Sequence, residues 1–541
     1  MAGRKLRSDF NLGGEAAEAD PLLEAAFYDS GLYSSIKNPT NPHCFLIGRT
    51  GSGKTALLRH LKDERPDHVI RINPEDLSLP YLLDLQVVQT LTAKGVRLDP
   101  FYVALWKHVF LVEIIQHRYH IDSPVAKRSF IDGLRARIGR DASKRAALDY
   151  LDAYGESFWC ETDERVREIS EHFARGFDLS SGLQGELPGV ASAVVKASYT
   201  ASKGGEIKSE ETEIYQRIVN EAQLARLNKM IETLDEEILD ASQNFTYLVI
   251  DDLDRDWVDD QVSNDLIRCL FRTALDMQSV RHLKIVIALR TNIFENLDFG
   301  SRTGGQEEKF RSLKQDVKWT KGELEHMADE RARVAAERGE ITHISSVKSL
   351  LPAHGRQGVH PLDHLLSRTL MRPRDLIAFL NEALSLVSGK SRLSWKDIDN
   401  AEHRYSEDRL LALRDEWKQN YPGLDRVFEQ FRACPARMDR AALIQRLDEC
   451  ALLPADPTFK GVVWMTELSL PLWSNAGTDF EGSYFPMIEL LFRVGLIGVS
   501  KKNGHIYFSH VDAQPALSNI KLGDATHFSV HPMYHMALDI A

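Results

Sequence analysis

The sequence predicts an α/β protein with a parallel β-sheet at its core, a helical insertion, a helical lid and a C-terminal winged-helix-like domain. Three observations predict it. Short, fully apolar runs recur up to Leu289 and are separated by helical patterns, which is typical of a parallel sheet covered on both faces. The region 346–420 is helical by its period. The chain then ends in a helix, a strand, a tight turn and a second strand, the order found in winged helices.

Composition limits the class of protein. The chain has 541 residues, 43% of them hydrophobic and 27% charged, which suits several packed domains and excludes disordered or collagen-like chains. Its 67 Lys and Arg against 79 Asp and Glu leave a net charge of −12. An excess of acid disfavours general binding to the phosphate backbone of nucleic acids, because that binding depends on Lys and Arg.

Cysteine usage and hydropathy indicate the compartment. The five cysteines are scattered and form no CxxC pair, which excludes zinc ribbons and disulfide frameworks and predicts thiols in a reducing compartment. No apolar run approaches the roughly 20 residues that cross a bilayer. The basic N-terminus is not followed by the apolar segment of a signal peptide. We therefore expect a cytoplasmic protein that does not contact membranes.

The patterns divide the chain into six segments. An Ala/Glu-rich helical pattern runs from Asn11 to Lys37, and a stretch rich in Ser, Gly and small residues near Ser180–Gly205 interrupts the long helical region that follows residue 120. The predicted segments are a helical lead-in (1–40), the first part of the α/β core (41–120), a mostly helical insertion (121–243), the second part of the core (244–345), the lid (346–420) and the winged-helix-like domain (421–541).

The expected strands are short and apolar. The core strands are predicted at Cys44–Ile47, His68–Ile72, Thr246–Ile250 and Leu283–Leu289, with two further β-like pieces around Ala191–Tyr199 in the insertion. The C-terminal pattern consists of a helix over Pro486–Val494, strands over Gly495–Ser500 and His505–His510, and an Asn503-Gly504 hairpin turn.

The first core strand leads into a phosphate-binding motif. The run from Gly48 to Thr55 fits GxxxxGK[ST], between a strand and a helix, where glycines let backbone N–H groups surround phosphates and the helix N-terminus adds positive charge. Lys54 would reach the β- and γ-phosphates of ATP, and Thr55 would bind Mg²⁺. A ligand-free turn or a dinucleotide loop would explain the glycines but not the Lys-Thr pair. The predicted nucleotide-binding residues are Gly48, Arg49, Thr50, Gly51, Ser52, Gly53, Lys54, Thr55 and Ala56.

Acids follow the strand Thr246–Ile250. In a parallel sheet this strand would deliver a carboxylate to the metal side of the phosphate site, so Asp251 is the predicted Mg²⁺-supporting acid, acting through the outer sphere. Asp252 is the predicted general base that polarises the attacking water. The alternative interpretation is a solvated acidic turn.

The strand Leu283–Leu289 also ends in polar residues. A side chain at this tip would face the γ-phosphate, which Arg290 would sense by charge or Asn292 by a hydrogen bond. The alternative is an exposed arginine at the end of a strand.

The lid contains a second basic motif. Arg372-Pro373-Arg374-Asp375 opens a helix with Pro at its start, and an arginine here could reach over the nucleotide when the lid closes. Arg374 is favoured, because Arg372 precedes the proline and is biased toward extended backbone. The alternative is a helix start with solvated arginines.

The motifs GRTGSGKT, LVIDDLDRD, IVIALRTNIF and MRPRDLIAFLN together resemble the STAND/KAP-like branch of the additional-strand P-loop NTPases, which is related to AAA+ ATPases. The likeness extends to stand-alone bacterial P-loop ATPases, many encoded in phage-defence loci, and covers roughly 41–62, 245–300 and 365–385. It implies ATP hydrolysis with Mg²⁺. The chain departs from the KAP pattern in lacking inserted membrane helices, and it carries no recognisable fused effector, so an effector would be a separate protein.

Two functions are compatible with these motifs. The favoured one is a regulatory ATPase, expected to form a homo-oligomer, whose ATP cycle controls a separate effector protein. The alternative is an initiator- or repair-type ATPase that engages DNA through its winged helix. Residues 421–541 contain 10 Lys and Arg but 13 Asp and Glu, which makes DNA the less favoured partner. A small-molecule kinase would need a compact lid with arginines clustered near the phosphate loop.

Overall fold

The computed structural model describes the chain in two compact units. The sheet unit comprises Gly31–Gly48 and Leu57–Asp316, and the lid unit comprises Met1–Ser30, Arg49–Ala56 and Val317–Ala541. The residues described are 5–7, 9–77, 85–121, 123–138, 144–159, 166–167, 170–171, 173–175, 216, 224–253, 260–297, 307–387, 389–475, 479–500, 504–510 and 525–540.

The sheet unit is built on five parallel strands in the order β2-β3-β4-β1-β5. They are β1 (Phe45–Gly48), β2 (Val69–Ile72), β3 (Thr246–Ile250), β4 (Leu283–Arg290) and β5 (Lys314–Asp316). The four predicted core strands are confirmed, and β5 is an edge strand that its polar sequence did not indicate. Strand β4 lies between β1 and β3 and pairs in parallel with both.

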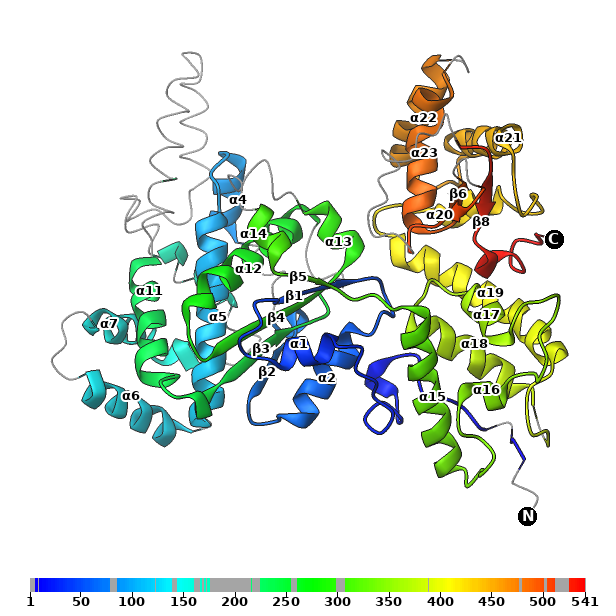
Figure 1. Ribbon diagram of the computed structural model, residues 1–541. Coiled ribbons are helices and arrows are strands. Elements are labelled where there is room, and N and C mark those ends of the chain that lie inside the picture. The colour runs from blue at the N-terminus through cyan, green and yellow to red at the C-terminus, as the bar shows by residue number, and fades with distance from the viewer. Residues whose placement is uncertain are drawn as a thin grey trace, which may run out of the picture. The chain divides into compact units, whose positions relative to one another are not determined.

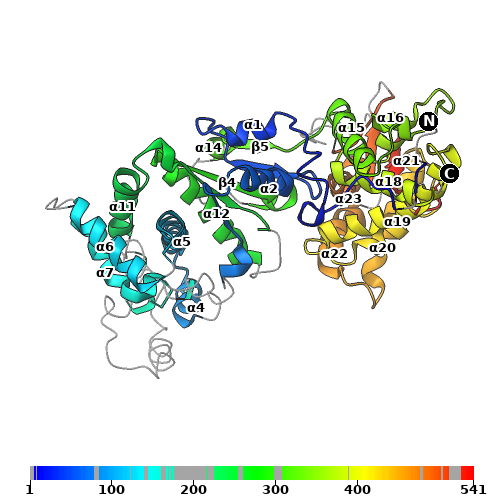
Figure 2. The ribbon, with the colours of Figure 1, turned by 90° about the horizontal axis from the view of Figure 1, so that it is seen from below.

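The sheet unit also contains helices, some of which pack on the sheet. They include α1 (Leu32–Lys37), α2 (Lys54–Glu64), α4 (Gln86–Ala93), α5 (Asp99–Tyr119), α11 (Leu224–Thr233), α12 (Asp260–Asp276), α13 (Thr291–Asn296) and α14 (Glu307–Ser312). Two views place α5 between α11 and α12 (Figure 1 and Figure 2). Trp106 of α5 is fully buried and donates its indole N–H to the Leu266 carbonyl of α12 at 3.0 Å. The nearly continuous apolar sequence of α5 therefore reflects burial on several sides.

The described parts of the insertion are helical, as predicted. They form α6 (Pro124–Ile138), α7 (Arg145–Tyr154) and α11 (Leu224–Thr233), and the last of these continues into a π-helical turn over Leu234–Ile238. The β-like pieces expected around Ala191–Tyr199 lie outside the described residues.

The lid unit begins with helices whose ends follow standard capping chemistry. They are α15 (Lys321–Arg338), α16 (Val347–Leu350), α17 (Pro361–Leu366), α18 (Pro373–Ser385) and α19 (Trp395–Trp417). Thr320 with Glu323 and Ser394 with Asp397 form capping boxes that start α15 and α19. Pro373 occupies the first turn of α18, where its missing N–H costs no hydrogen bond.

The C-terminal part combines helices with a small antiparallel sheet. The helices are α20 (Leu424–Glu429), α21 (Arg440–Ala451), α22 (Val462–Asn475) and α23 (Phe480–Val494), and the sheet has the order β7-β6-β8, with β6 at Ile497–Ser500, β7 at Ile506–Tyr507 and β8 at Phe528–Val530. The helix and the pairing of its two following strands agree with the prediction. Helix α23, however, begins at Phe480 and contains Pro486.

The winged-helix interpretation itself stays a prediction. Strand β8 is a third strand of this sheet. The sequence pattern did not indicate it, because a strand of only three residues gives too short a pattern to recognise. Of the expected Asn503-Gly504 turn, Asn503 lies outside the described residues, as do Lys501 and Lys502 at the tip of the predicted wing, whereas Gly504 is described with a φ of 75°.

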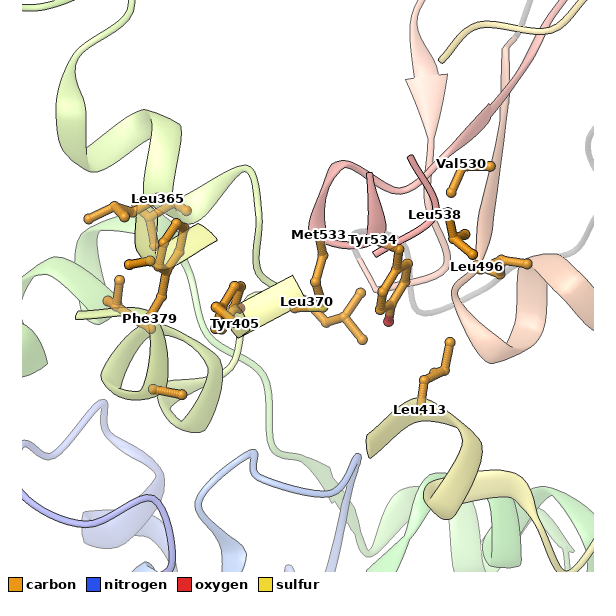
Figure 3. Close-up of a cluster of buried hydrophobic side chains, with 14 of the residues drawn as sticks. Leu365, Leu370, Phe379, Tyr405, Leu413, Leu496, Val530, Met533, Tyr534 and Leu538 are labelled. Atoms are coloured by element: carbon orange, nitrogen blue, oxygen red, sulfur yellow. The ribbon is translucent and has the colours of Figure 1, made fainter. Parts of the chain in front are cut away.

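One hydrophobic core unites the lid helices with the C-terminal domain. Figure 3 shows Tyr534 and Met533 of the C-terminal segment beside Leu370, Leu413 and Tyr405 of the lid, and these residues belong to a single buried cluster. The Ser406 hydroxyl of α19 donates to the Met533 carbonyl at 2.7 Å. The lid and the C-terminal domain therefore form one packed body.

The predicted helical lead-in is mostly non-helical. Only a 3₁₀ turn at Ala17–Ala19 and the short α1 are helical between Asn11 and Lys37. Gly13 adopts a φ of 94°, which a helix cannot contain, and the adjacent backbone is held by lid side chains. Asn381 of α18 accepts a hydrogen bond from the Leu12 N–H at 2.8 Å and donates to the Gly13 carbonyl at 2.8 Å.

A buried ion pair completes the attachment of this segment. Arg331 of α15 contacts Asp20 at 2.7 Å, and their side chains are 7% and 1% exposed. Arg331 also donates to the Leu12 carbonyl, and Asp20 accepts the backbone N–H groups of Gly14 and Leu22. The lead-in is thus a strap across the lid unit, and we use "strap" below for residues 11–23.

Among the described residues, no helix has the length and apolarity needed to span a membrane.

Replacing Asp20 with Ala should destabilise the lid unit. The substitution leaves Arg331 as a buried charge without its partner, and the loss of one partner of a buried ion pair lowers stability by about 3–5 kcal/mol. The free energy of unfolding from urea titration should fall accordingly, whereas Glu24→Ala, an exposed acid in the same segment, should change it by less than about 0.5 kcal/mol. Equal effects of the two substitutions would show that the strap is not anchored through Asp20.

Candidate functional site

The phosphate-binding motif forms a tight loop between β1 and α2. Strand β1 ends at Gly48 and α2 begins at Lys54, as the motif requires. Gly51 and Gly53 have φ values of 77° and 100°, a backbone region that favours glycine. The Lys54 ammonium, on a residue only 9% exposed, donates to the Arg49 carbonyl at 3.2 Å. The loop therefore presents successive N–H groups and a lysine at a helix N-terminus, which is an arrangement suited to phosphates.

Arg372 attaches the lid to this loop. Its guanidinium donates to the Thr50 carbonyl at 2.9 Å and to both carboxylate oxygens of Asp375, at 2.8 and 2.9 Å. Its backbone is extended, with φ −121° and ψ 143°, as expected before a proline. Burial alone would raise the pKa of Asp375, but Arg372 outweighs it and holds that pKa below its usual range.

Arg374 lies against the same loop on another side. A Cβ at Gly51 would come within 2.8 Å of the Arg374 Cβ, so only glycine fits there. Arg374 also lines a cavity of about 90 Å³ with Gly51, Lys54, Thr55 and strap residues including Glu15 and Glu18. Both arginines of the motif therefore contact the phosphate loop, and they do so differently: Arg372 holds its backbone, whereas Arg374 faces the cavity.

The charge of Arg374 is weakly compensated. Among the described residues its guanidinium has no carboxylate partner and donates to the Glu15 carbonyl at 3.2 Å. Burial first, and then the neighbouring charge of Arg372, lowers the pKa of Arg374. A half-buried cation that has no carboxylate partner among the described residues, placed beside a phosphate loop, is well placed to attract an anion.

The predicted acids lie at the carboxyl end of β3. Asp251 is 4% exposed, whereas Asp252 is half-buried and has a φ of 59°. An ion pair joins the Asp252 carboxylate to Arg71 of β2 at 3.2 Å. This pairing does not remove Asp252 as a candidate base, but it means that the carboxylate is held by a cation that the sequence pattern did not indicate.

The polar tip of β4 lies at the same edge of the sheet. Gly48 of β1 is paired in register with Arg290 of β4, so Arg290 stands level with the start of the phosphate loop. Asn292, in the first turn of α13, is 6% exposed. The sheet therefore brings together the strand ends that carry Gly48, Asp251 and Arg290, as a parallel arrangement of β1, β4 and β3 requires.

Several residues that contact the loop or the adjacent strap escaped sequence reasoning. Trp319 donates its indole N–H to the Ser52 carbonyl at 2.7 Å, and Glu416 near the end of α19 accepts hydrogen bonds from Arg49 and Arg372. Arg409 of α19 contacts the Glu15 carboxylate at 3.0 Å. These residues are hundreds of positions from the loop in sequence and belong to no short motif, so only the fold reveals them.

Comparisons with known proteins agree with this geometry. Residues 30–287 match the family model described as an AAA ATPase domain, and residues 322–414 match the FunZ-associated C-terminal helical domain. The chain therefore contains an α/β P-loop ATPase domain of the AAA type, which hydrolyses ATP, and a helical domain follows it.

Individual relatives are distant. The chain is 21% identical to the transposon gamma-delta 80.3 kDa protein of Escherichia coli (strain K12), over 98% of this chain and 67% of that protein. A Walker-type ATPase of Pyrococcus abyssi, PABY2304, shares 11% identity with a TM-score of 0.35, covering 89% of this chain and 93% of the other. The second likeness is too low to carry an argument.

Substituting Lys54 with Ala should abolish ATP binding. The lysine is the charged group of the loop placed for the β- and γ-phosphates, and its loss leaves the backbone cradle without that charge. Equilibrium binding of a fluorescent ATP analogue should fall below detection, while the cooperative thermal unfolding of the protein is retained. Arg59→Ala, on an outer turn of α2, is the matched control and should bind normally. Micromolar affinity in Lys54→Ala would contradict the assignment.

Substitutions of Asp252 and Asp251 should have different effects on ATP hydrolysis. Asp252→Asn should bind ATP but hydrolyse it about 10²-fold or more slowly, the usual scale for a positioned base, whereas Asp251→Asn should chiefly raise the Mg²⁺ concentration needed. Single-turnover hydrolysis at several Mg²⁺ concentrations distinguishes them. Normal turnover in Asp252→Asn together with a loss in Asp254→Asn would show that the base lies further along the acidic run.

Proposed function

We propose that this ATPase is a regulatory switch: it binds ATP with Mg²⁺, and hydrolysis changes its conformation or assembly so as to control a separate effector protein. The observation that carries the proposal is the contact between the phosphate loop and the lid. A switch must make different contacts in its two states, and here the lid arginines lie on the very loop that would hold the phosphates.

The donor set fits a magnesium nucleotide. In this proposal the Thr55 hydroxyl would be a direct oxygen ligand of Mg²⁺ and the Asp251 carboxylate would support the ion through its outer sphere, and the bound ion would neutralise phosphate charge. The loop N–H groups and Lys54 orient the phosphates. Asp252 accepts the proton of the attacking water after its carboxylate turns from Arg71, and Arg290 or Asn292 contacts the γ-phosphate side.

Arg374 supplies the difference between ATP and ADP. Because it faces the cavity with weak compensation, a γ-phosphate would gain a charge-assisted hydrogen bond from it that ADP does not offer. Arg372 has a different role, since its guanidinium is already occupied by Asp375, Thr50 and Glu416. In this proposal Arg372 keeps the lid and the loop in register while Arg374 senses the nucleotide.

The finer parts of the proposal rest on the motif resemblance. They are membership of the STAND/KAP-like branch, assembly into a homo-oligomer, cytoplasmic location and a role in anti-phage defence through an effector encoded nearby. Co-purification of the product of the adjacent gene, with and without ATP, tests the partner directly.

The transposon relative favours one alternative. The name of that relative assigns it to a transposon, which is mobile DNA, and the strand pair after α23 is the element with which a winged helix would contact DNA. The acidic balance of residues 421–541 opposes it. The two proposals differ in whether the C-terminal domain contacts nucleic acid or protein.

Arg374→Ala should leave ATP affinity within about tenfold of the wild type but remove the ATP-versus-ADP difference in conformation or assembly, because the charged contact to the γ-phosphate is lost. Size-exclusion chromatography with light scattering in the two nucleotides measures the difference. Arg404→Ala, an exposed lid arginine, is the matched control and should keep it. A difference that survives Arg374→Ala would disprove the sensing role.

DNA binding should be weak. At about 0.1 M salt, fluorescence anisotropy with a duplex should show no saturable binding at micromolar protein, because a phosphate-binding surface needs a basic excess. Saturable binding that weakens steeply with salt would instead support the DNA-engaging alternative.

A further inference from the structure

We propose that Arg49, although it belongs to the phosphate-binding motif, is a coupling residue whose side chain connects the phosphate loop to the C-terminal domain. This inference rests on the proposed switch function and names the contact that would transmit it. Motif position alone assigns Arg49 to nucleotide binding, since it follows Gly48 in GxxxxGK[ST].

The Arg49 side chain contacts the C-terminal domain at one defined point. Its Nη2 donates to the carbonyl of Val494, the last residue of α23, at 2.8 Å. A cation at this position is favoured, because the carbonyls at a helix C-terminus carry partial negative charge. Arg49 therefore caps α23, the helix that leads through Gly495 into β6.

A buried carboxylate closes the connection. Arg49 donates from Nε and Nη2 to the two oxygens of Glu416, at 3.2 and 3.3 Å, and the Glu416 side chain is 6% exposed. The same carboxylate accepts from Arg372, which also holds the Thr50 carbonyl. The loop is thus fastened twice, through the Arg49 side chain and through the Thr50 backbone, to one acid of the lid. We call Arg49, Glu416 and Arg372, with the Val494 and Thr50 carbonyls, the loop joint.

The backbone of the C-terminal domain accommodates the guanidinium closely. Gly495 has a φ of 95°, and a Cβ at this position would lie 2.9 Å from the Arg49 Nη1. Any other residue at 495 would therefore be strained and would also press on the arginine. The glycine therefore leaves the space at the end of α23 that the Arg49 guanidinium occupies.

The surrounding C-terminal residues experience the charge of the joint. Desolvation first, and then Arg49 and Arg372, lowers the pKa of the half-buried His510 to about 3, so this side chain is neutral at physiological pH. Within the described part of the chain, the Arg49 Nη1, the His510 Nδ1 and the Tyr534 hydroxyl are buried without a hydrogen-bond partner. Unsatisfied buried polar groups are costly, so the joint is sensitive to small movements of the loop.

Nucleotide binding acts on the same loop. Lys54 donates to the Arg49 carbonyl and would turn toward phosphates when ATP binds, which changes the restraint on Arg49. Because the joint is polar, it can exchange partners without losing the apolar contacts through which the C-terminal domain packs on the lid. The predicted consequence is that ATP alters the end of α23 and β6 through Arg49.

Hydrogen–deuterium exchange of the full chain tests the joint first without nucleotide. Arg49→Ala should increase exchange at the backbone amides of residues 480–500 by about tenfold, since the cap of α23 and its charged partner are lost. Gly495→Ala should do the same from the other side of the contact. Gly504→Ala is the matched control, because Gly504 also has a positive φ, of 75°, but a Cβ there meets no atom within 4 Å.

Exchange in 480–500 within twofold of the wild type for Arg49→Ala would overturn the joint. So would equal effects of Gly495→Ala and Gly504→Ala, because backbone strain alone would then explain the result. The conservative variant Glu416→Gln keeps the shape of the acid and should give an intermediate increase.

A second measurement adds a non-hydrolysable ATP analogue. In the wild type the analogue should change exchange in 480–500, and in Arg49→Ala that change should shrink at least fivefold while analogue affinity stays within tenfold. An affinity loss comparable to that of Lys54→Ala would make Arg49 a nucleotide ligand and overturn the proposal. A wild type that binds the analogue without any change in 480–500 would also overturn it. A wild type that does not bind the analogue would refute the proposed function instead, and the nucleotide-free comparison would still decide the joint.

Discussion

The buried pairing of Arg372 with Asp375 is the interaction on which the lid side of this site depends. The two side chains are 9% and 0% exposed and form two hydrogen bonds with each other. A buried ion pair contributes little net stability, but losing one partner is costly, so the pair specifies one arrangement strongly. In this arrangement Arg372, just before α18, donates to the Thr50 carbonyl, and Arg374 in the first turn of α18 lies against Gly51.

The same arrangement explains why the phosphate loop belongs to the lid unit. Loop residues Arg49–Ala56 follow β1 in sequence, but Arg372, Glu416 and Trp319 of the lid unit hold them by hydrogen bonds. The strap, anchored by Arg331 and Asp20, lines the cavity beside the loop with the helix that carries Arg374. In a nucleotide switch this division is useful, because the element that binds phosphates is then physically attached to the element that responds.

Charge is distributed unevenly around the loop. Arg372 and Arg49 share Glu416, and Arg409 contacts Glu15, but among the described residues Arg374 has only a backbone carbonyl. The first set of contacts stabilises the lid unit, and in the proposed switch the weakly compensated Arg374 is the arginine that meets the nucleotide. All four residues are arginines, so they differ in their partners and not in residue type.

The sequence by itself determined the parts of this protein that depend on local chemistry. Apolar runs with flanking turns predicted the four core strands, because burial on both faces of a parallel sheet requires uninterrupted hydrophobic residues. The spacing of Gly51, Gly53 and Lys54 predicted the phosphate loop, since only glycine adopts those backbone angles without strain. The proline after Arg372 predicted both the start of α18 and the extended backbone before it.

Only the tertiary structure decided which distant groups meet these motifs. The lead-in was predicted as helix from its composition, but hydrogen bonds from Asn381 and Arg331 hold it as a strap, so tertiary contacts outweighed helix propensity. Glu416 and Arg71 could not be predicted as partners of Arg49 and Asp252, because an ion pair between residues far apart in sequence leaves no periodic signal. The motif identified which residues can bind phosphate, and the fold determined that one of them, Arg49, is directed to a helix end instead, where a carbonyl and a buried carboxylate satisfy its charge.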